Sequence, residues 1–76
     1  MPDPTETPIQ MAERHIIEGG TRIARQEAQI AELDRDGHDH MLPEANKLLE
    51  MMRAQQVQAK AHLARLLAKK AGESQD

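Results

Sequence analysis

Four histidines are the side chains with the most obvious capacity for chemistry, and two of them lie at the middle of the chain. His38 and His40 flank Asp39, and Asp36 is close by. Two imidazoles and two carboxylates in one short segment can bind Zn²⁺ or Ni²⁺, since imidazole is a ligand of both metals. Capping of helices already accounts for the aspartates, however, and surface turns often carry histidine. We therefore assign no metal ligands here and keep metal binding as the alternative hypothesis.

The other two histidines, His15 and His62, lie far apart in the sequence. If the two halves of the chain pair as antiparallel helices, both rings flank the same seam near its open end, with Glu18 as a third candidate ligand. The pair can also form a pH-sensitive contact, because two imidazolium ions side by side repel one another. The simpler interpretation, which we favour, is that both rings are partly exposed and cover the seam.

Catalytic patterns are not evident in the sequence. Ser74 is the only serine, cysteine is lacking, and no nucleophile–base pair or glycine-rich phosphate loop occurs. A Glu-x-x-His motif on each half, as in di-iron bundles, is also missing. Without cysteine there is no disulfide and no thiolate metal site. We predict that the protein is not an enzyme, with no catalytic or cofactor-binding residues.

Two long apolar patterns must position these side chains, one on each side of residues 36–39. In each pattern the spacing alternates between three and four residues, as at the a and d positions of a coiled coil. The first pattern is Ile9, Ala12, Ile16, Gly19, Ile23, Gln26, Ile30 and Leu33, and the second is Leu42, Ala45, Leu49, Met52, Gln56, Ala59, Leu63 and Leu66. Folding at Gly37 pairs all of them in one antiparallel register, from Ile9 with Leu66 to Leu33 with Leu42. The fold predicted is an all-α, antiparallel two-helix hairpin resembling a coiled coil.

Local signals place the boundaries of this hairpin domain at residues 7–72. We expect a disordered segment 1–6, a helix 7–35, a turn 36–39, a helix 40–71 and a disordered end 73–76. Thr7 and Gln10 form a capping box, with Pro8 at the first helical position. Gly37 is the expected left-handed stop of the first helix, and Asp39 is the expected cap of the second.

Gly19 and Gly20 interrupt the first helical pattern. Gly19 can allow close approach of the second helix, the pair can mark a kink, or the helix can break there. We favour a continuous helix, because Ile16 and Ile23 keep heptad phase across the pair. Gln26 and Gln56, the polar residues of the seam, are expected to fix register and partner number rather than to perform chemistry.

A single hairpin of 76 residues has little apolar surface to bury, since it lacks Phe, Tyr and Trp and several seam positions are small or polar. A second, weaker apolar stripe lies beside the seam. It comprises Ile17, Gly20, Ala24, Ala28 and Ala31, and we expect Leu48, Met51 and Leu67 to add to it. We predict a homodimer, or a higher homo-oligomer, in which hairpins form a four-helix bundle, the alternative being a marginal monomer. A helix of another protein is a further candidate partner.

The net charge of −3 is unevenly distributed, because the second helix is basic. Residues 43–71 carry six basic side chains and two acidic ones. We interpret these as solvated flanks of the seam rather than as a nucleic-acid interface, which would more often have a basic total and aromatic contacts. No apolar run approaches the roughly 20 residues of a membrane span. The N-terminus does not resemble a signal peptide, so we expect a cytoplasmic protein.

Three short runs resemble a known pattern: AERHI at 12–16, RIARQ at 22–26 and LDRDGHD at 33–39. They resemble a set of short, uncharacterised bacterial proteins with an AERH…RIARQ…DGHD pattern and a leucine-rich second helix. The resemblance covers about three quarters of the chain and implies a helical hairpin but no established activity. The function expected is that of a small non-enzymatic protein acting through self-association and protein–protein interaction. The alternative is a histidine-dependent metal-binding or metal-sensing bundle.

Overall fold

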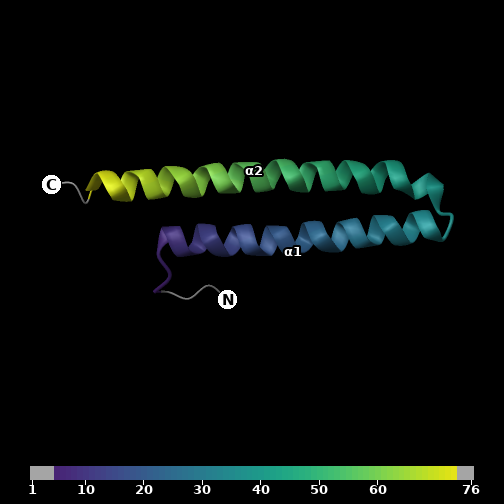
Figure 1. Ribbon diagram of the computed structural model, residues 1–76, viewed down its shortest axis with the longest axis horizontal. Helices are drawn as coiled ribbons and strands as arrows, with labels where there is room; N and C mark the ends of the chain where they lie inside the picture. Colours follow the sequence, from purple (N-terminus) through teal and green to yellow (C-terminus); the bar gives the residue numbers. More distant parts are fainter. Residues whose placement is uncertain (1–4, 74–76) are drawn as a thin grey trace.

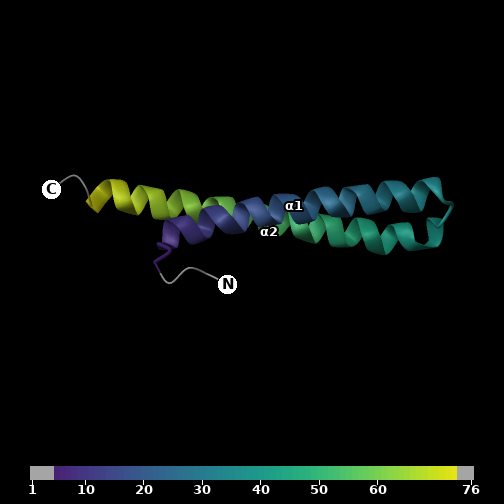
Figure 2. The ribbon, with the colours of Figure 1, turned by 90° about the horizontal axis from the view of Figure 1, so that it is seen from below.

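The computed structural model describes residues 5–73, which form two long antiparallel helices joined by a tight turn (Figure 1). Helix α1 spans Pro8–Arg35, a 3₁₀ turn η1 spans Asp39–Met41, and helix α2 spans Leu42–Glu73. The molecule measures 60 × 23 × 13 Å along its principal axes. Figure 2 shows α1 crossing over α2 at a shallow angle, and the C-terminal end of α2 extends beyond the start of α1. The prediction of an all-α hairpin is confirmed.

Burial follows the predicted seam closely. All sixteen seam positions are buried or half-buried, and elsewhere in residues 5–73 only Glu6, Arg14 and Glu18 share that status. The most buried positions are Ala12, Leu49 and Gln26. Ile9 and Leu66 line the same groove at the open end, as the register requires. The helices therefore pair through one stripe each, and the rest of both surfaces faces outward.

The two seam glutamines bond across the hairpin to main-chain carbonyls. Gln26 Nε2 donates to Ala45 O at 2.9 Å, and Gln56 Nε2 donates to Ile16 O at 2.7 Å. Gln26 is 7% exposed, so its amide would carry a desolvation penalty without this partner. A shift of one helix along the other would break both bonds, which supports the expected role of these side chains in fixing the register.

The start of α1 follows the predicted capping box. Thr7 Oγ1 accepts a hydrogen bond from Gln10 N at 3.1 Å, and Thr7 N donates to Gln10 Oε1 at 3.0 Å. Glu6, which we expected to lie in a disordered segment 1–6, is instead held by two hydrogen bonds from Arg14. Residues 1–4 of that segment lie outside the described residues.

Helix α1 ends in the left-handed glycine that the sequence predicts. Gly37 has a φ of 77°, and main-chain bonds close the helix end behind it. His38 N donates to Leu33 O at 2.9 Å and Gly37 N to Asp34 O at 3.3 Å, the pattern of a Schellman motif. The chain thus reverses within a few residues and presents α2 to α1 in the antiparallel register.

The start of α2 differs from our expectation. Asp39 begins the 3₁₀ turn instead of capping a helix at residue 40, and the long helix starts at Leu42. Proline explains the shift, because Pro43 has no N–H to donate to the Asp39 carbonyl four residues earlier. Leu42 N takes that acceptor instead, and a bond spanning three residues makes a 3₁₀ turn. At the other end α2 continues to Glu73, beyond the expected end at 71, and 74–76 lie outside the described residues.

Gly19 and Gly20 lie within a continuous α1, as the heptad phase predicts. Gly19 faces Gln56, and a Cβ at position 19 would overlap Gln56 Oε1. The missing side chain therefore makes room for the amide that bonds to Ile16 O. The space at Gly19 is thus occupied by a side chain of α2, and not by its backbone as the close-approach alternative supposed.

We expect Gly19→Ala to have different effects on stability in two backgrounds. In the otherwise unchanged protein, the new methyl displaces Gln56, and the lost bond offsets a gain of about 1 kcal/mol in helix propensity. In a Gln56→Ala background the same substitution should raise the free energy of unfolding by about 1 kcal/mol. Denaturant unfolding followed by circular dichroism measures both. Equal effects in the two backgrounds would contradict the close packing of Gly19 on Gln56.

Candidate functional site

The hairpin has two broad faces, one on each side of the seam. An ion pair between α1 and α2 lies on the first of these faces. Arg53 Nη2 lies 3.2 Å from Glu27 Oε2. Glu27 also lines a groove with Ala31, Asp34 and Asn46 on this side of the seam. Residues three, four or seven positions apart share a helix face, so further residues join this one. We call this the Ile17 face; its small or apolar members are Ile17, Gly20, Ala24 and Ala31 of α1 with Val57 and Leu67 of α2, and Glu27 and Arg53 are charged members. Ala28, which we expected in this stripe, is exposed two residues after the seam residue Gln26 and lies on the outer surface of α1 instead.

We call the opposite side of the seam the Leu48 face. Leu48 lines a groove with Gln29, Met41 and Glu44, and Met51 follows Leu48 by three residues. The expectation that Leu48 and Met51 add to the Ile17 stripe is therefore wrong, whereas Leu67 does lie on the Ile17 face. Leu48 comes just before the seam residue Leu49, whereas Leu67 comes just after the seam residue Leu66. Side chains before and after a seam position project to opposite sides of the seam.

Large apolar side chains are exposed on both faces, and the most exposed lie on the Ile17 face. Ile17 is 71% exposed and Val57 is 67% exposed. Ile17 and Val57 lie at nearly the same height along the hairpin. Gly19, two residues after Ile17, lies against the side chain of Gln56, the residue before Val57. Large apolar side chains exposed to water on one face are unfavourable for a protein that stays alone. The Ile17 face is therefore the candidate interaction surface.

A further groove lies on the Leu48 face and has a volume of about 250 Å³. His15, Arg22 and Gln55 form its rim, and Gly19 and Gln56 form its floor. Ligand pockets of enzymes usually surround most of a small molecule, whereas this groove is a shallow channel between two helices. It offers hydrogen-bond donors but no neighbouring nucleophile and base.

Three of the four histidines lie in two separate regions, and the fourth, His62, is exposed on α2. The rings of His38 and His40 pack edge to face with centroids 6.2 Å apart at the turn, while His15 lies in the groove just described. Within residues 5–73, no three side chains among His, Cys, Asp and Glu come together in a group that could hold a metal ion. Glu18, the expected third ligand beside His15, is engaged by Arg14 at 2.8 Å. The structure thus brings none of the proposed ligand sets together.

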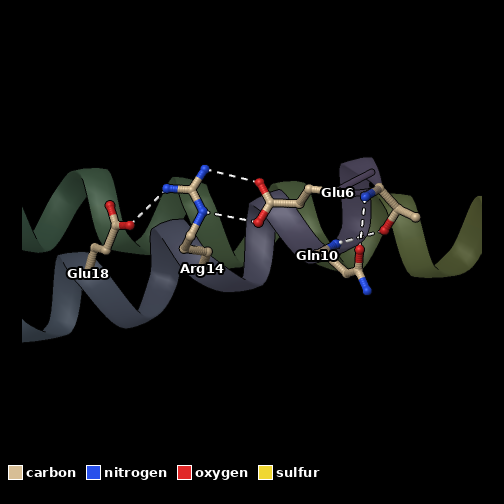
Figure 3. Close-up of polar contacts among 5 residues, drawn as sticks. Glu6, Gln10, Arg14 and Glu18 are labelled. Carbon is tan, nitrogen blue, oxygen red and sulfur yellow. Dashed lines mark hydrogen bonds and ion pairs between the residues drawn. The ribbon is translucent and has the colours of Figure 1, made fainter. Parts of the chain in front are cut away.

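The densest polar cluster of α1 is centred on Arg14 (Figure 3). Its Nε and Nη2 each donate to one oxygen of Glu6 at 3.1 Å, and Nη1 donates to Glu18. The Glu6 side chain is only 13% exposed. The hydrogen bonds that Arg14 donates, first to Glu6 and then to Glu18, raise the pKa of Arg14. The cluster fastens the segment before α1 to the outer surface of that helix.

Helical spacing accounts for the Arg14–Glu18 pair but not for the contact of Arg14 with Glu6. An i,i+4 spacing within a helix is a known signal for an ion pair. Glu6 precedes Arg14 by eight residues and lies outside the helix, so no helical spacing rule relates them. The capping box at Thr7, which fixes the angle at which the chain enters the helix, is the one sequence feature that favours this contact.

Among the described residues, no helix is long and apolar enough to cross a membrane. Comparison of the chain with protein-family models, with curated proteins and with solved structures gave no match. The functional conclusion therefore depends on the geometry of the two faces.

Replacing Arg14 with Gln should raise the pKa of Glu18 toward its ordinary value. In the protein this pKa is lowered from 4.5, chiefly by the hydrogen bond from Arg14. A lowered carboxyl pKa adds stability that is fully present above about pH 4.5 and is lost as the pH falls through the folded value. Carbon-detected NMR titration of the Glu18 carboxyl measures the change. Arg35→Gln, at the far end of α1, should leave this titration unchanged, and an unshifted Glu18 in Arg14→Gln would contradict the assignment.

Proposed function

We propose that this is a small non-enzymatic protein that acts by helix-to-helix association, and that two copies join through their Ile17 faces into a four-helix bundle. The observation that carries the proposal is the pairing of Ile17 and Val57, more than two thirds exposed, at one height of one face. Association would remove both side chains from water. Burial of such side chains stabilises a complex by roughly 1.5–3 kcal/mol each.

The small interior of the hairpin supports the same proposal. Among residues 5–73 only Ala12, Leu49 and Gln26 are less than a tenth exposed, and one is alanine and another polar. Chains of this size usually need a disulfide, a metal or a partner to remain folded. A partner that covers one face would turn a two-helix contact into a core enclosed on all sides.

The Ile17 face suits a helix partner better than the Leu48 face does. Gly20, Ala24 and Ala31 are small, so a second helix can approach α1 closely between the larger side chains. Both faces also carry polar side chains that need hydrogen-bond partners when buried. On the Ile17 face Arg53 and Glu27 already pair with one another, whereas Arg22 and Gln55 line the central groove of the Leu48 face. A second copy of the chain is the partner we propose, and a helix of another protein is the alternative occupant.

Ala24→Glu should disperse the assembly. An unpaired carboxylate at the centre of the interface opposes association by about 3 kcal/mol or more, which corresponds to at least a hundredfold rise in the dissociation constant. Sedimentation equilibrium over a range of concentrations measures this. Ala61→Glu makes the same substitution on the outer surface of α2 and should leave the mass of the assembly unchanged.

A third variant identifies the face. Met51→Glu lies on the Leu48 face and should also leave the assembly intact. If Met51→Glu dispersed it while Ala24→Glu did not, the interface would be the Leu48 face. A wild-type chain that sediments as one copy at every concentration would reject self-association itself.

A further inference from the structure

We infer that the groove beside Gly19 is a binding site for a small organic carboxylate, which Arg22 holds. The groove lies on the Leu48 face and has a volume of about 250 Å³. The proposed self-association uses the opposite face, so the groove stays open in the assembly and each copy carries one. The site is formed within a single hairpin and does not depend on the dimer.

Hydrogen-bond donors from both helices meet at this groove. Arg22 and His15 line it from α1, and Gln55 lines it from α2. A guanidinium presents its N–H groups in a planar fork that matches the two oxygens of a carboxylate. The side-chain amide of Gln55 supplies further N–H donors from the opposite wall. A carboxylate in the groove can therefore be bound from two sides.

Arg22 is the charged group that is available for such a ligand. Its expected partner on the helix is Glu18, four residues before it. Glu18 instead accepts a hydrogen bond from Arg14 at 2.8 Å (Figure 3). Within residues 5–73, Arg22 forms no hydrogen bond or ion pair. Its guanidinium thus keeps its full capacity to bind an anion from outside the hairpin.

The protein places no carboxylate of its own along this groove. The side chains that line it are neutral or basic, and residues 51–72, which include its whole α2 wall, contain no Asp or Glu. On the Ile17 face, by contrast, the guanidinium of Arg53 is paired with Glu27. An external carboxylate in the groove therefore meets no acidic side chain that repels it or takes its place.

The rest of the lining indicates the class of carboxylate. Met52 and Ala59 line the groove beside the polar groups, so a short aliphatic group attached to the carboxylate gains apolar contact. A single guanidinium lines the groove, which matches the single charge of a carboxylate. The ligand expected is a short aliphatic carboxylate, either a free acid or the C-terminus of a peptide that ends in an aliphatic residue.

Titration with isovalerate, followed by ¹H–¹⁵N NMR, tests the site. We expect a dissociation constant of about 1–10 mM, because the groove is open to water and the ligand is small. The backbone signal of Gly19 and the side-chain signals of Arg22 and Gln55 should shift and saturate. The backbone signals of Ala24 and Ala31, on the Ile17 face, should not shift.

Isovaleramide has the same shape as isovalerate without the charge, and it should bind at least about fivefold more weakly. Equal binding of the acid and the amide would overturn the inference. So would the absence of saturating shifts at Gly19 and Gln55 when isovalerate is added in large excess.

Two matched variants identify the arginine. Arg22→Gln should weaken binding of isovalerate at least about fivefold. Arg25→Gln removes the same charge three residues further along α1, at a position that does not line the groove, and should change binding less than about twofold. Both side chains are exposed, so both variants should keep the circular dichroism spectrum of the original chain. Equal losses in the two variants would show a general effect of charge and overturn the site.

Further measurements distinguish the source of the carboxylate and separate this site from the dimer. N-acetylleucine mimics the C-terminus of a peptide. Binding about tenfold tighter than that of isovalerate would assign the site to a peptide, and comparable or weaker binding would assign it to a free acid. Ala24→Glu, which should disperse the dimer, should change isovalerate binding less than about twofold. Loss of binding in this variant would overturn a site formed within one copy.

Discussion

The structure depends on the register between α1 and α2. The alternating spacing of three and four residues gives each helix one apolar stripe, and the reversal at Gly37 lets the stripes meet over their whole length. Apolar contact alone resists a shift by one heptad only weakly, because the next layer is also apolar. Gln26 and Gln56 make the register specific, since each must reach one main-chain carbonyl of the opposite helix.

The same register determines what remains exposed. With seam residues turned inward, Ile17 and Val57 must project outward on one face, and Leu48 and Met51 on the other. A hairpin has no third element to cover these side chains. The proposed association through the Ile17 face thus follows from the pairing of the helices, in the way that a repeat unit needs a neighbour to complete its core.

Features set by short-range rules were predictable from the sequence. The seam positions, the capping box at Thr7 and the left-handed Gly37 each depend on the spacing or type of a few nearby residues, and all agree with the structure. The later start of α2 was missed because two rules compete there. A cap at Asp39 favours an early start, but the missing N–H of Pro43 delays the α-helical pattern to Leu42.

Features that depend on the packing of the two helices were harder to predict. Glu6 meets Arg14 only because the chain turns back along α1 before its first residue. The spacing shows that Leu48 lies off the seam, but it does not show on which side of the seam the side chain projects. Grouping Leu48 with the Ile17 stripe was therefore wrong. For the candidate site, periodicity found the exposed stripe at Ile17, but the contribution of Val57 emerged only once Gly19 and Gln56 were seen in contact.

The central claim is that one hairpin is incomplete and needs a partner. Native mass spectrometry of the untagged chain, with thermal unfolding followed by circular dichroism at several concentrations, tests it most directly. We predict a metal-free mass of two copies, or a multiple of two, and a melting temperature that rises with concentration. A one-copy mass with a concentration-independent melting temperature would contradict the claim. So would a fixed mass excess of a transition metal, which would favour a histidine-dependent site instead.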